Sequence, residues 1–297
     1  MEYVIGVDGG GTKTEAVAYD LTGTEIKTSL TGFGNLNNDK DEAVQNIINS
    51  IKELVDELGT EGLKGIYLGL AGSEVGDNAK IVHEEIKKVF DIDSSVMNDG
   101  DLALKALLKG EDGILVIAGT GSIAFGLKGD TQAKVGGWGN LLGDEGSAYK
   151  ISIEAYKKLI FENDYGFEHS ALSKEILEYL NISCADDLVG FIYSSTKDEI
   201  AKIAHIVSKH AENGDEFAIK VLQTEGTEIA KQAERVYNKL GMEKCSIGLV
   251  GGVIRKSKVF RETFENYLNS NINVVNFVDD KVSPAKGAYY IYLKNNK

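Results

Sequence analysis

The chain has 297 residues, of which 46 are acidic and 32 basic, so its formal net charge is −14; it contains 34 glycines and a single proline. Nucleic-acid binding is disfavoured because it requires clustered basic side chains, and the sequence has no Lys- or Arg-rich run. No apolar stretch reaches the roughly 18 residues of a membrane span, and two cysteines, Cys184 and Cys245, are too few for a disulfide framework. The apolar segment Tyr3–Val7 leaves no room for a signal peptide. We expect a cytoplasmic protein without a nucleic-acid or membrane partner.

The first part of the chain alternates short apolar segments with amphipathic ones. Apolar residues recur every three or four positions in 39–58, a pattern that predicts a helix ending at Gly59. The same reasoning predicts helices at 78–90 and 102–108, and strands at 3–7, 15–19, 66–70, 95–97 and 113–118. Alternating strands and helices indicate an α/β protein.

A strand that runs into a glycine turn and then a second strand occurs twice, at 4–19 and again at 115–127. The echo favours two copies of one nucleotide-binding unit, although such turns are common in α/β proteins. Residues 149–240 are predicted to be mostly helical, with the longest helix at 217–240, and a last strand follows at 246–250. The lone proline, Pro284, is expected to open a final helix, where its missing N–H costs nothing.

The segment Asp8–Thr14 directly follows the first strand and contains three consecutive glycines. Glycines let the backbone turn tightly and direct N–H groups at an oxyanion, and the hydroxyls of Thr12 and Thr14 add donors. At the end of a strand, Asp8 is placed to hold a hydrated Mg²⁺ beside a phosphate. The spacing fits neither the Walker A pattern nor the dinucleotide fingerprint. A phosphate loop and a plain hairpin turn both remain open at this point.

Two further glycine turns follow predicted strands. Gly119–Ser122 is a candidate for a second phosphate loop, and Gly251–Val253 for a wall of a nucleotide site. One such turn is weak evidence, but three at the ends of strands favour nucleotide binding. No Gly-x-Ser-x-Gly elbow is present, which disfavours a hydrolase with a serine nucleophile.

The segment Asn98–Asp101 lies where a strand gives way to a helix. A carboxylate there can accept a proton from an alcohol that attacks a phosphoryl group. It can equally serve as a helix N-cap. We expect Asp101 to be the cap and Asp99 to be the base.

The densest glycine tract, 136–148, contains the only tryptophan, Trp138, and ends in capping residues. A rigid glycine loop that carries Trp, Asp and Ser suits a sugar, which needs both stacking and fixed hydrogen bonds. A purely structural loop is the alternative.

Together these motifs resemble the actin/hexokinase/Hsp70 ATPase superfamily, and within it the N-acetylglucosamine kinase branch of the BadF/BadG-type ATPases. The resemblance rests on 7–14, 69–72, 98–99, 118–122 and 137–148, which run in the family's order over essentially the full chain. It implies two actin-like (ribonuclease H-like) α/β domains with a cleft between them. The first would comprise residues 1–112 and the C-terminal helix at about 284–297, and the second residues 113–283 with a helical insertion.

The resemblance also implies roles for individual residues. Asp99 would be the general base for the 6-hydroxyl of an amino sugar, and Asp8 would hold Mg²⁺. ATP would contact three glycine-rich segments, at Gly10, Gly11, Thr12 and Lys13; at Thr120, Gly121 and Ser122; and at Gly251 and Gly252. The sugar would be bound by Asn35, Trp138, Asp144 and Ser147, together with Asp99.

The expected activity is that of an ATP-dependent sugar kinase acting on N-acetylglucosamine, with N-acetylmuramic acid and free glucosamine as rival substrates. The same family contains ATPase activators of radical dehydratases and subunits of reductases, and the activators hold an iron–sulfur cluster with cysteines. Neither Cys184 nor Cys245 matches those ligand positions, which disfavours this alternative. A sugar sensor on the same fold would need neither Asp8 nor Asp99. The resemblance further suggests a homodimer.

Overall fold

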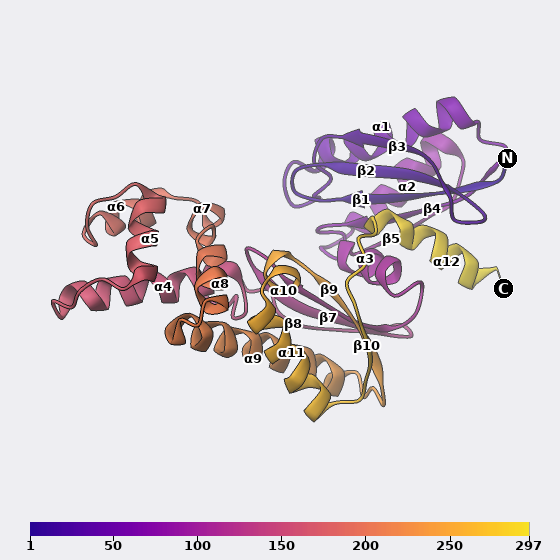
Figure 1. Ribbon diagram of the computed structural model, residues 1–297. Coiled ribbons are helices and arrows are strands. Elements are labelled where there is room, and N and C mark those ends of the chain that lie inside the picture. The colour runs from indigo at the N-terminus through magenta and orange to yellow at the C-terminus, as the bar shows by residue number, and fades with distance from the viewer. Residues whose placement is uncertain (297) are drawn as a thin grey trace. The chain divides into compact units, whose positions relative to one another are not determined.

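The computed structural model describes residues 1–296, and the chain forms two compact units. Unit 1 comprises Met1–Gly113 and the segment from Asp280 onward, and unit 2 comprises Ile114–Asp279. Each unit contains one five-stranded sheet with helices packed against it (Figure 1). None of the helices in the described residues is long and apolar enough to cross a membrane.

The sheet of unit 1 has the strand order β3-β2-β1-β4-β5. Its strands are β1 (Tyr3–Gly9), β2 (Thr14–Asp20), β3 (Glu25–Thr31), β4 (Leu63–Leu70) and β5 (Ser94–Met97). The hairpin of β1 and β2 is antiparallel and places Asp8 opposite Glu15. Strand β4 is parallel to β1, and β5 is parallel to β4. The carboxyl ends of these three strands therefore meet at one edge of the sheet, where Asp8 lies.

The helices of unit 1 are α1 (Lys40–Leu58), α2 (Asn78–Phe90), α3 (Asp99–Leu107) and α12 (Gly287–Asn295), with a short 3-10 turn, η1 (Pro284–Lys286), before α12. Helix α1 begins after Asp39, whose side chain accepts from the Glu42 N–H, and ends at Gly59 with a positive φ. The C-terminal segment returns to pack on α3 and β1. A Cβ on Gly6 would collide with the Ala285 carbonyl oxygen, so glycine is required in β1 for this packing.

The sheet of unit 2 repeats the arrangement, with the order β10-β9-β6-β7-β8. Its strands are β6 (Gly113–Ala118), β7 (Ser122–Lys128), β8 (Thr131–Gly136), β9 (Cys245–Val250) and β10 (Val274–Val278). The order β8-β7-β6-β9-β10 corresponds strand for strand to β3-β2-β1-β4-β5. The two α/β units therefore share one topology, as expected for a duplicated unit.

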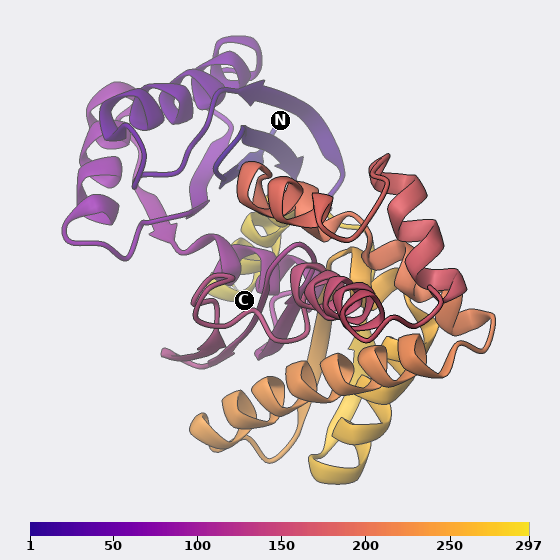
Figure 2. The same cartoon turned by 90° about the vertical axis from the view of Figure 1, so that its left-hand side faces the viewer.

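The helices of unit 2 are α4 (Ala148–Asp164), α5 (Ala171–Leu180), α6 (Asp187–Ser194), α7 (Lys197–Ala201), α8 (Ala204–Glu212), α9 (Glu216–Lys239), α10 (Gly252–Lys256) and α11 (Lys258–Asn271). Helices α9 and α11 lie side by side, and α9 packs against β7 and β8 (Figures 1 and 2). In Figure 1, α5 and α6 stand away from the sheet. The prediction that residues 149–240 are mostly helical is confirmed, and α9 is the longest helix there, as predicted for 217–240.

Three strands escaped the sequence analysis: β3, β8 and β10. All three lie at the edges of their sheets. Strands β3 and β8 are polar and largely exposed, so they lack the apolar run that marks a buried strand. Strand β10, Val274–Val278, is short but apolar, and its pattern was overlooked. The prediction that 246–250 is the last strand is therefore wrong, because β10 follows it.

Candidate functional site

Two half-buried carboxylates, Asp8 and Asp99, lie near each other at the edge of the unit 1 sheet. Asp8 is at the end of β1, and Asp99 opens α3 directly after β5. The pKa of Asp8 is raised to about 6, mainly by burial and then by the charges of Asp99 and Glu15, while Lys13 opposes the rise. The pKa of Asp99 is also raised, mainly by burial. Unit 1 thus holds two acids whose negative charges are poorly compensated.

The start of α3 differs from expectation. The N-cap is Asn98, whose side-chain oxygen accepts from the Gly100 N–H at 2.9 Å. The prediction that Asp101 is the cap is wrong: it lies inside the first turn and is only 5% exposed. Asn98 takes the role because its backbone is extended while Asp99 is already helical. Asp99 accepts from the same Gly100 N–H through Oδ1 at 2.9 Å, which fixes its carboxylate beside the helix N-terminus.

The glycine turn after Asp8 closes the β1–β2 hairpin. The Gly10 N–H donates to the Lys13 carbonyl oxygen at 3.1 Å, and the exposed Gly11 and Thr12 lie at the tip. The hairpin interpretation is therefore structurally correct, and it leaves the phosphate role open as a proposal. The Lys13 side chain bends back to Glu15 at 3.1 Å.

The structure brings Asn35 to this turn. Both the Gly34 and Asn35 N–H groups donate to the Gly10 carbonyl oxygen, at 2.9 and 3.1 Å. A Cβ on Gly34 would lie 2.8 Å from the Gly9 Cα, so only glycine allows the loop to approach so closely. The Asn35 side chain accepts from the Asn37 N–H, which holds it in a local turn. Unit 1 therefore gathers Asp8, Asp99 and the loop of Asn35 at one edge.

In unit 2, the glycine turns at 119–122 and 251–252 lie side by side. The Gly119 N–H donates to the Gly121 carbonyl oxygen at 3.0 Å, and the Ala148 N–H at the start of α4 donates to the Gly119 carbonyl oxygen at 2.7 Å. Gly251 has a φ of +111°, and a Cβ there would collide with the Ala118 carbonyl group. The close approach of two strand ends therefore depends on glycine at this position.

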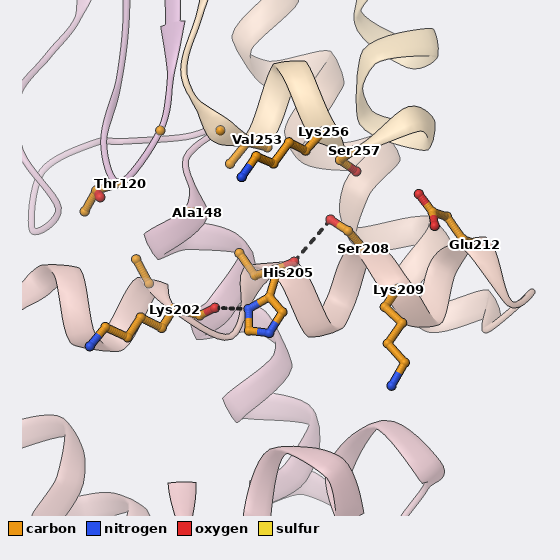
Figure 3. Close-up of a pocket in the computed structure, with 14 residues that line it drawn as sticks. Thr120, Ala148, Lys202, His205, Ser208, Lys209, Glu212, Val253, Lys256 and Ser257 are labelled. Carbon is orange, nitrogen blue, oxygen red and sulfur yellow. Dashed lines mark hydrogen bonds between the residues drawn. The ribbon is translucent and has the colours of Figure 1, made fainter. Parts of the chain in front are cut away.

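A cavity of about 480 Å³ opens beside these turns. This volume is in the range of small-ligand sites. Its lining comes from Gly119 and Thr120, from α7 and α8 and the residues between them, and from Gly252 to Ser257 (Figure 3). Sequence reasoning found the glycine turns but missed the helical side of the cavity, which includes Lys202, His205 and Ser208.

Several lining residues are basic, which is notable in a chain of net charge −14. Lys209 is occupied by an ion pair with Glu175 at 2.8 Å and points away from the cavity in Figure 3. Lys256 is exposed, and its side chain extends past Val253 on the cavity side of α10 in Figure 3. Lys256 therefore offers a positive charge at the cavity, whose lining also includes the acidic Glu212.

The glycine tract at 136–147 presents its polar residues unequally. Asp144 is 2% exposed, and its Oδ2 forms an ion pair with Lys197 Nζ at 2.6 Å. Ser147 is fully buried and caps α4, accepting from the Lys150 N–H at 3.1 Å. Trp138, by contrast, is 69% exposed. The structure thus ties Asp144 to the glycine turn at 119–122, since its Oδ1 accepts from the Ser122 N–H at 3.4 Å, and leaves Trp138 facing solvent.

The remaining histidines and the cysteines have ordinary surroundings. His83 bonds to the Ser94 carbonyl oxygen, and His210 to Glu175. Cys184 is exposed, whereas burial of Cys245 raises the pKa of its thiol to about 12. No group of three or more His, Cys, Asp or Glu able to hold a metal occurs among the described residues. For Mg²⁺ such a group is not required, because this ion typically takes one or two carboxylates together with substrate phosphates.

Two sheets of the same strand order, each with a glycine turn after its central strand, are the arrangement of the two-domain, actin-like ATPase fold. The chain belongs to the BadF/BadG/BcrA/BcrD ATPase family, whose model matches residues 5–291.

The known proteins to which this chain is similar are consistent with its membership of this family. The chain is 33% identical over 300 residues to the N-acetylmuramic acid/N-acetylglucosamine kinase of Clostridium acetobutylicum, covering 98% of each chain. It is 26% identical to the N-acetyl-D-glucosamine kinase of Dictyostelium discoideum, covering 100% of this chain and 99% of that one. A solved structure from Chromobacterium violaceum, provisionally assigned as an N-acetylglucosamine kinase, shares the fold with a TM-score of 0.71 at 24% identity, covering 97% of this chain and 98% of that one.

Proposed function

We propose that this protein is an ATP-dependent kinase that phosphorylates the 6-hydroxyl of an amino sugar, N-acetylglucosamine in the first place and N-acetylmuramic acid as a second substrate. The observation that carries the proposal is the pair Asp8 and Asp99, set beside a glycine turn in a chain of this ATPase family. The sugar class is supported by the relatives, which are kinases of these two sugars.

Asp99 is the proposed general base. Its raised pKa makes the carboxylate a better proton acceptor than an ordinary aspartate. As the sugar hydroxyl attacks the terminal phosphoryl group of ATP, Asp99 takes its proton. Phosphoryl transfer depends mainly on positioning and on neutralising charge, so one well-held carboxylate is sufficient as the base.

Asp8 is the proposed residue for Mg²⁺. The donor chemistry fits, because its carboxylate oxygen is the ligand that Mg²⁺ prefers and its pKa is raised partly by the charges of Asp99 and Glu15. A bound cation would supply the missing positive charge and neutralise the phosphates. Gly11, Thr12 and Lys13 would offer N–H groups and hydroxyl or ammonium donors at the same edge, and Gly10, whose N–H bonds to the Lys13 carbonyl oxygen, would shape the turn.

The nucleotide contacts proposed in unit 2 are Thr120, Gly121 and Ser122 from one turn and Gly251 and Gly252 from the other. Their support is the cavity of about 480 Å³, which Thr120 and Gly252 line directly. Asn35, Trp138, Asp144 and Ser147 remain the proposed sugar contacts. Since the Ser147 hydroxyl is occupied as a cap, its contribution would be to hold the loop in position.

The test measures ADP release in a coupled assay, with N-acetylglucosamine, N-acetylmuramic acid and glucosamine as acceptors. We expect turnover with the acetylated sugars. Turnover with free glucosamine alone would favour the activity of another relative, the glucosamine kinase of Vibrio cholerae, which is 24% identical over 255 residues. Rapid ATP hydrolysis without any sugar acceptor would contradict the kinase proposal. A cytoplasmic location and a homodimer remain predictions, to be tested by fractionation and by sedimentation.

A further inference from the structure

The substrate loop, defined here as residues 136–147, rests on one side of helix α9. Two glycines mark the contacts. A Cβ on Gly136 would collide with the Gln232 side chain, and a Cβ on Gly146 would lie 2.5 Å from the Ile229 Cβ. Both glycines also have positive φ, +84° and +85°. The loop is therefore packed against α9 at its beginning and at its end.

Buried polar side chains of α9 complete this attachment. Glu225 is 5% exposed, and its Oε2 accepts from the Gly146 N–H at 2.6 Å. Gln232 is 4% exposed, and its Nε2 donates to the Glu145 carbonyl oxygen at 3.2 Å. The same carbonyl oxygen accepts from the Ser122 hydroxyl at 2.7 Å. The network thus joins α9, the substrate loop and the proposed phosphate turn.

We propose that Glu225 is a positioning residue for the substrate loop, whose carboxylate holds Gly146 so that Asp144 and Ser147 keep the conformation that binds the amino sugar. This inference rests on the proposed function for its kinetic consequence. An uncharged acceptor would suffice for one N–H group, but a carboxylate makes a shorter and stronger bond. The strength of the bond between the buried Glu225 and the Gly146 N–H therefore depends on the charge of the carboxylate.

The surroundings of Glu225 place its titration near neutral pH. Its pKa is raised to about 7, mainly by burial; the Gly146 N–H and Lys150 oppose the rise, while Glu154 and Glu145 add to it. Lys150 and Glu154 come from α4 and Glu145 from the loop. From α11, it is Phe260 and Thr263 that approach α9 at the neighbouring Gly226. Above pH 7 the ionised carboxylate holds the loop, and below pH 7 its protonation weakens the bond.

The kinetic test compares wild type with Glu225→Gln at pH 6 and pH 8. At pH 8 we expect the variant to raise KM for the amino sugar about tenfold, with kcat and KM for ATP within twofold of wild type. In wild type, KM for the sugar should rise as the pH falls through 7, whereas the variant should lack this inflection. Glu234→Gln is the matched control on the same helix, because Glu234 bonds to the Tyr267 hydroxyl instead.

A second variant separates titration from packing. Glu154→Gln removes a charge that raises the pKa of Glu225, so the inflection should move to lower pH while KM at pH 8 stays unchanged. An inflection that persists in Glu225→Gln, or a variant that lowers kcat and raises both KM values equally, would overturn the proposal. Thermal unfolding of each variant identifies any that merely fail to fold.

A readout without substrate keeps the inference independent of the proposed function. Trp138 is the only tryptophan in the chain and lies in the substrate loop. Its fluorescence should change between pH 6 and pH 8 in wild type and remain constant in Glu225→Gln. If the fluorescence transition occurs but no sugar is phosphorylated, the positioning role stands and the proposed function fails. If sugar is phosphorylated without such a transition, the positioning role fails alone.

Discussion

The two sheets share one strand order, yet the ends of their central strands carry different chemistry. In unit 1, Asp8 is the next-to-last residue of β1, and a second acid, Asp99, lies near it. In unit 2, the corresponding β6 ends at Ala118, and the glycine turn that follows borders a cavity whose lining includes Lys202 and Lys256. The same strand order thus carries an acidic edge in unit 1 and a cavity in unit 2. The difference teaches that strand order alone does not define a site, because the residues that follow the strands decide its chemistry.

The largest effect should come from the acidic edge. Replacing Asp99 by Asn keeps the shape but removes the proposed proton acceptor, and we expect kcat to fall about a thousandfold. Sugar binding, measured by calorimetry, should change less than threefold. Unchanged turnover would remove Asp99 from the role of base and would erase the functional contrast between the two sheets.

The second effect concerns the other acid of the pair. Asp8→Asn should lower kcat about a hundredfold at limiting Mg²⁺, because the proposed carboxylate ligand is lost. Raising the Mg²⁺ concentration should recover part of the activity, whereas it should recover none in Asp99→Asn. Equal behaviour of the two variants across a Mg²⁺ titration would mean that the acids do not divide their tasks in this way.

The third prediction breaks the glycine turn of unit 2. Gly251→Ala places a Cβ against the Ala118 carbonyl group at a φ of +111°, so we expect a loss of about 2 kcal/mol in the free energy of unfolding. The adjacent Gly252 is the matched control, since a Cβ there meets nothing within 4 Å. Denaturant unfolding of both variants measures the difference. Equal stabilities would show that the close approach of the two turns is not required.

These predictions depend on residues that the sequence revealed to different degrees. Helix α2 and strand β6 were predicted to the residue, because buried apolar periodicity and flanking glycines are local signals. The turn after β1 and the acid Asp99 could be singled out for the same reason. Asn98 was missed as the cap because several capping residues stand side by side, and only backbone geometry distinguishes them.

Contacts between residues far apart in the sequence could not be predicted from local sequence patterns. Glu225 lies in an ordinary amphipathic helix, and its bond to Gly146 joins residues 79 positions apart. The cavity side of α8 is likewise a stretch of polar and apolar residues whose position next to Gly119 follows only from tertiary packing. The edge strands β3 and β8 were missed because exposed strands lack the hydrophobic signal. A resemblance to a family supplies motif residues, but it does not supply the residues that support them.

The smallest expected effect concerns the stability of the acidic edge itself. The pKa of Asp8 is about 6 in the folded chain, against the ordinary aspartate value of 3.8 that applies when the chain is unfolded, so ionising it disfavours folding. Stability contributed by the protonated form is complete below pH 3.8 and is lost as the pH rises through 6. At pH 7.5, Asp8→Asn should therefore be more stable than wild type by about 1 kcal/mol, after allowance for solvent screening of a half-buried group. The gain should disappear by about pH 4. Thermal unfolding of wild type and Asp8→Asn across this pH range measures the difference. If Asp8→Asn is less stable than wild type at pH 7.5, a partner in the folded chain compensates the charge of Asp8, and the acidic edge of unit 1 does not destabilise the fold.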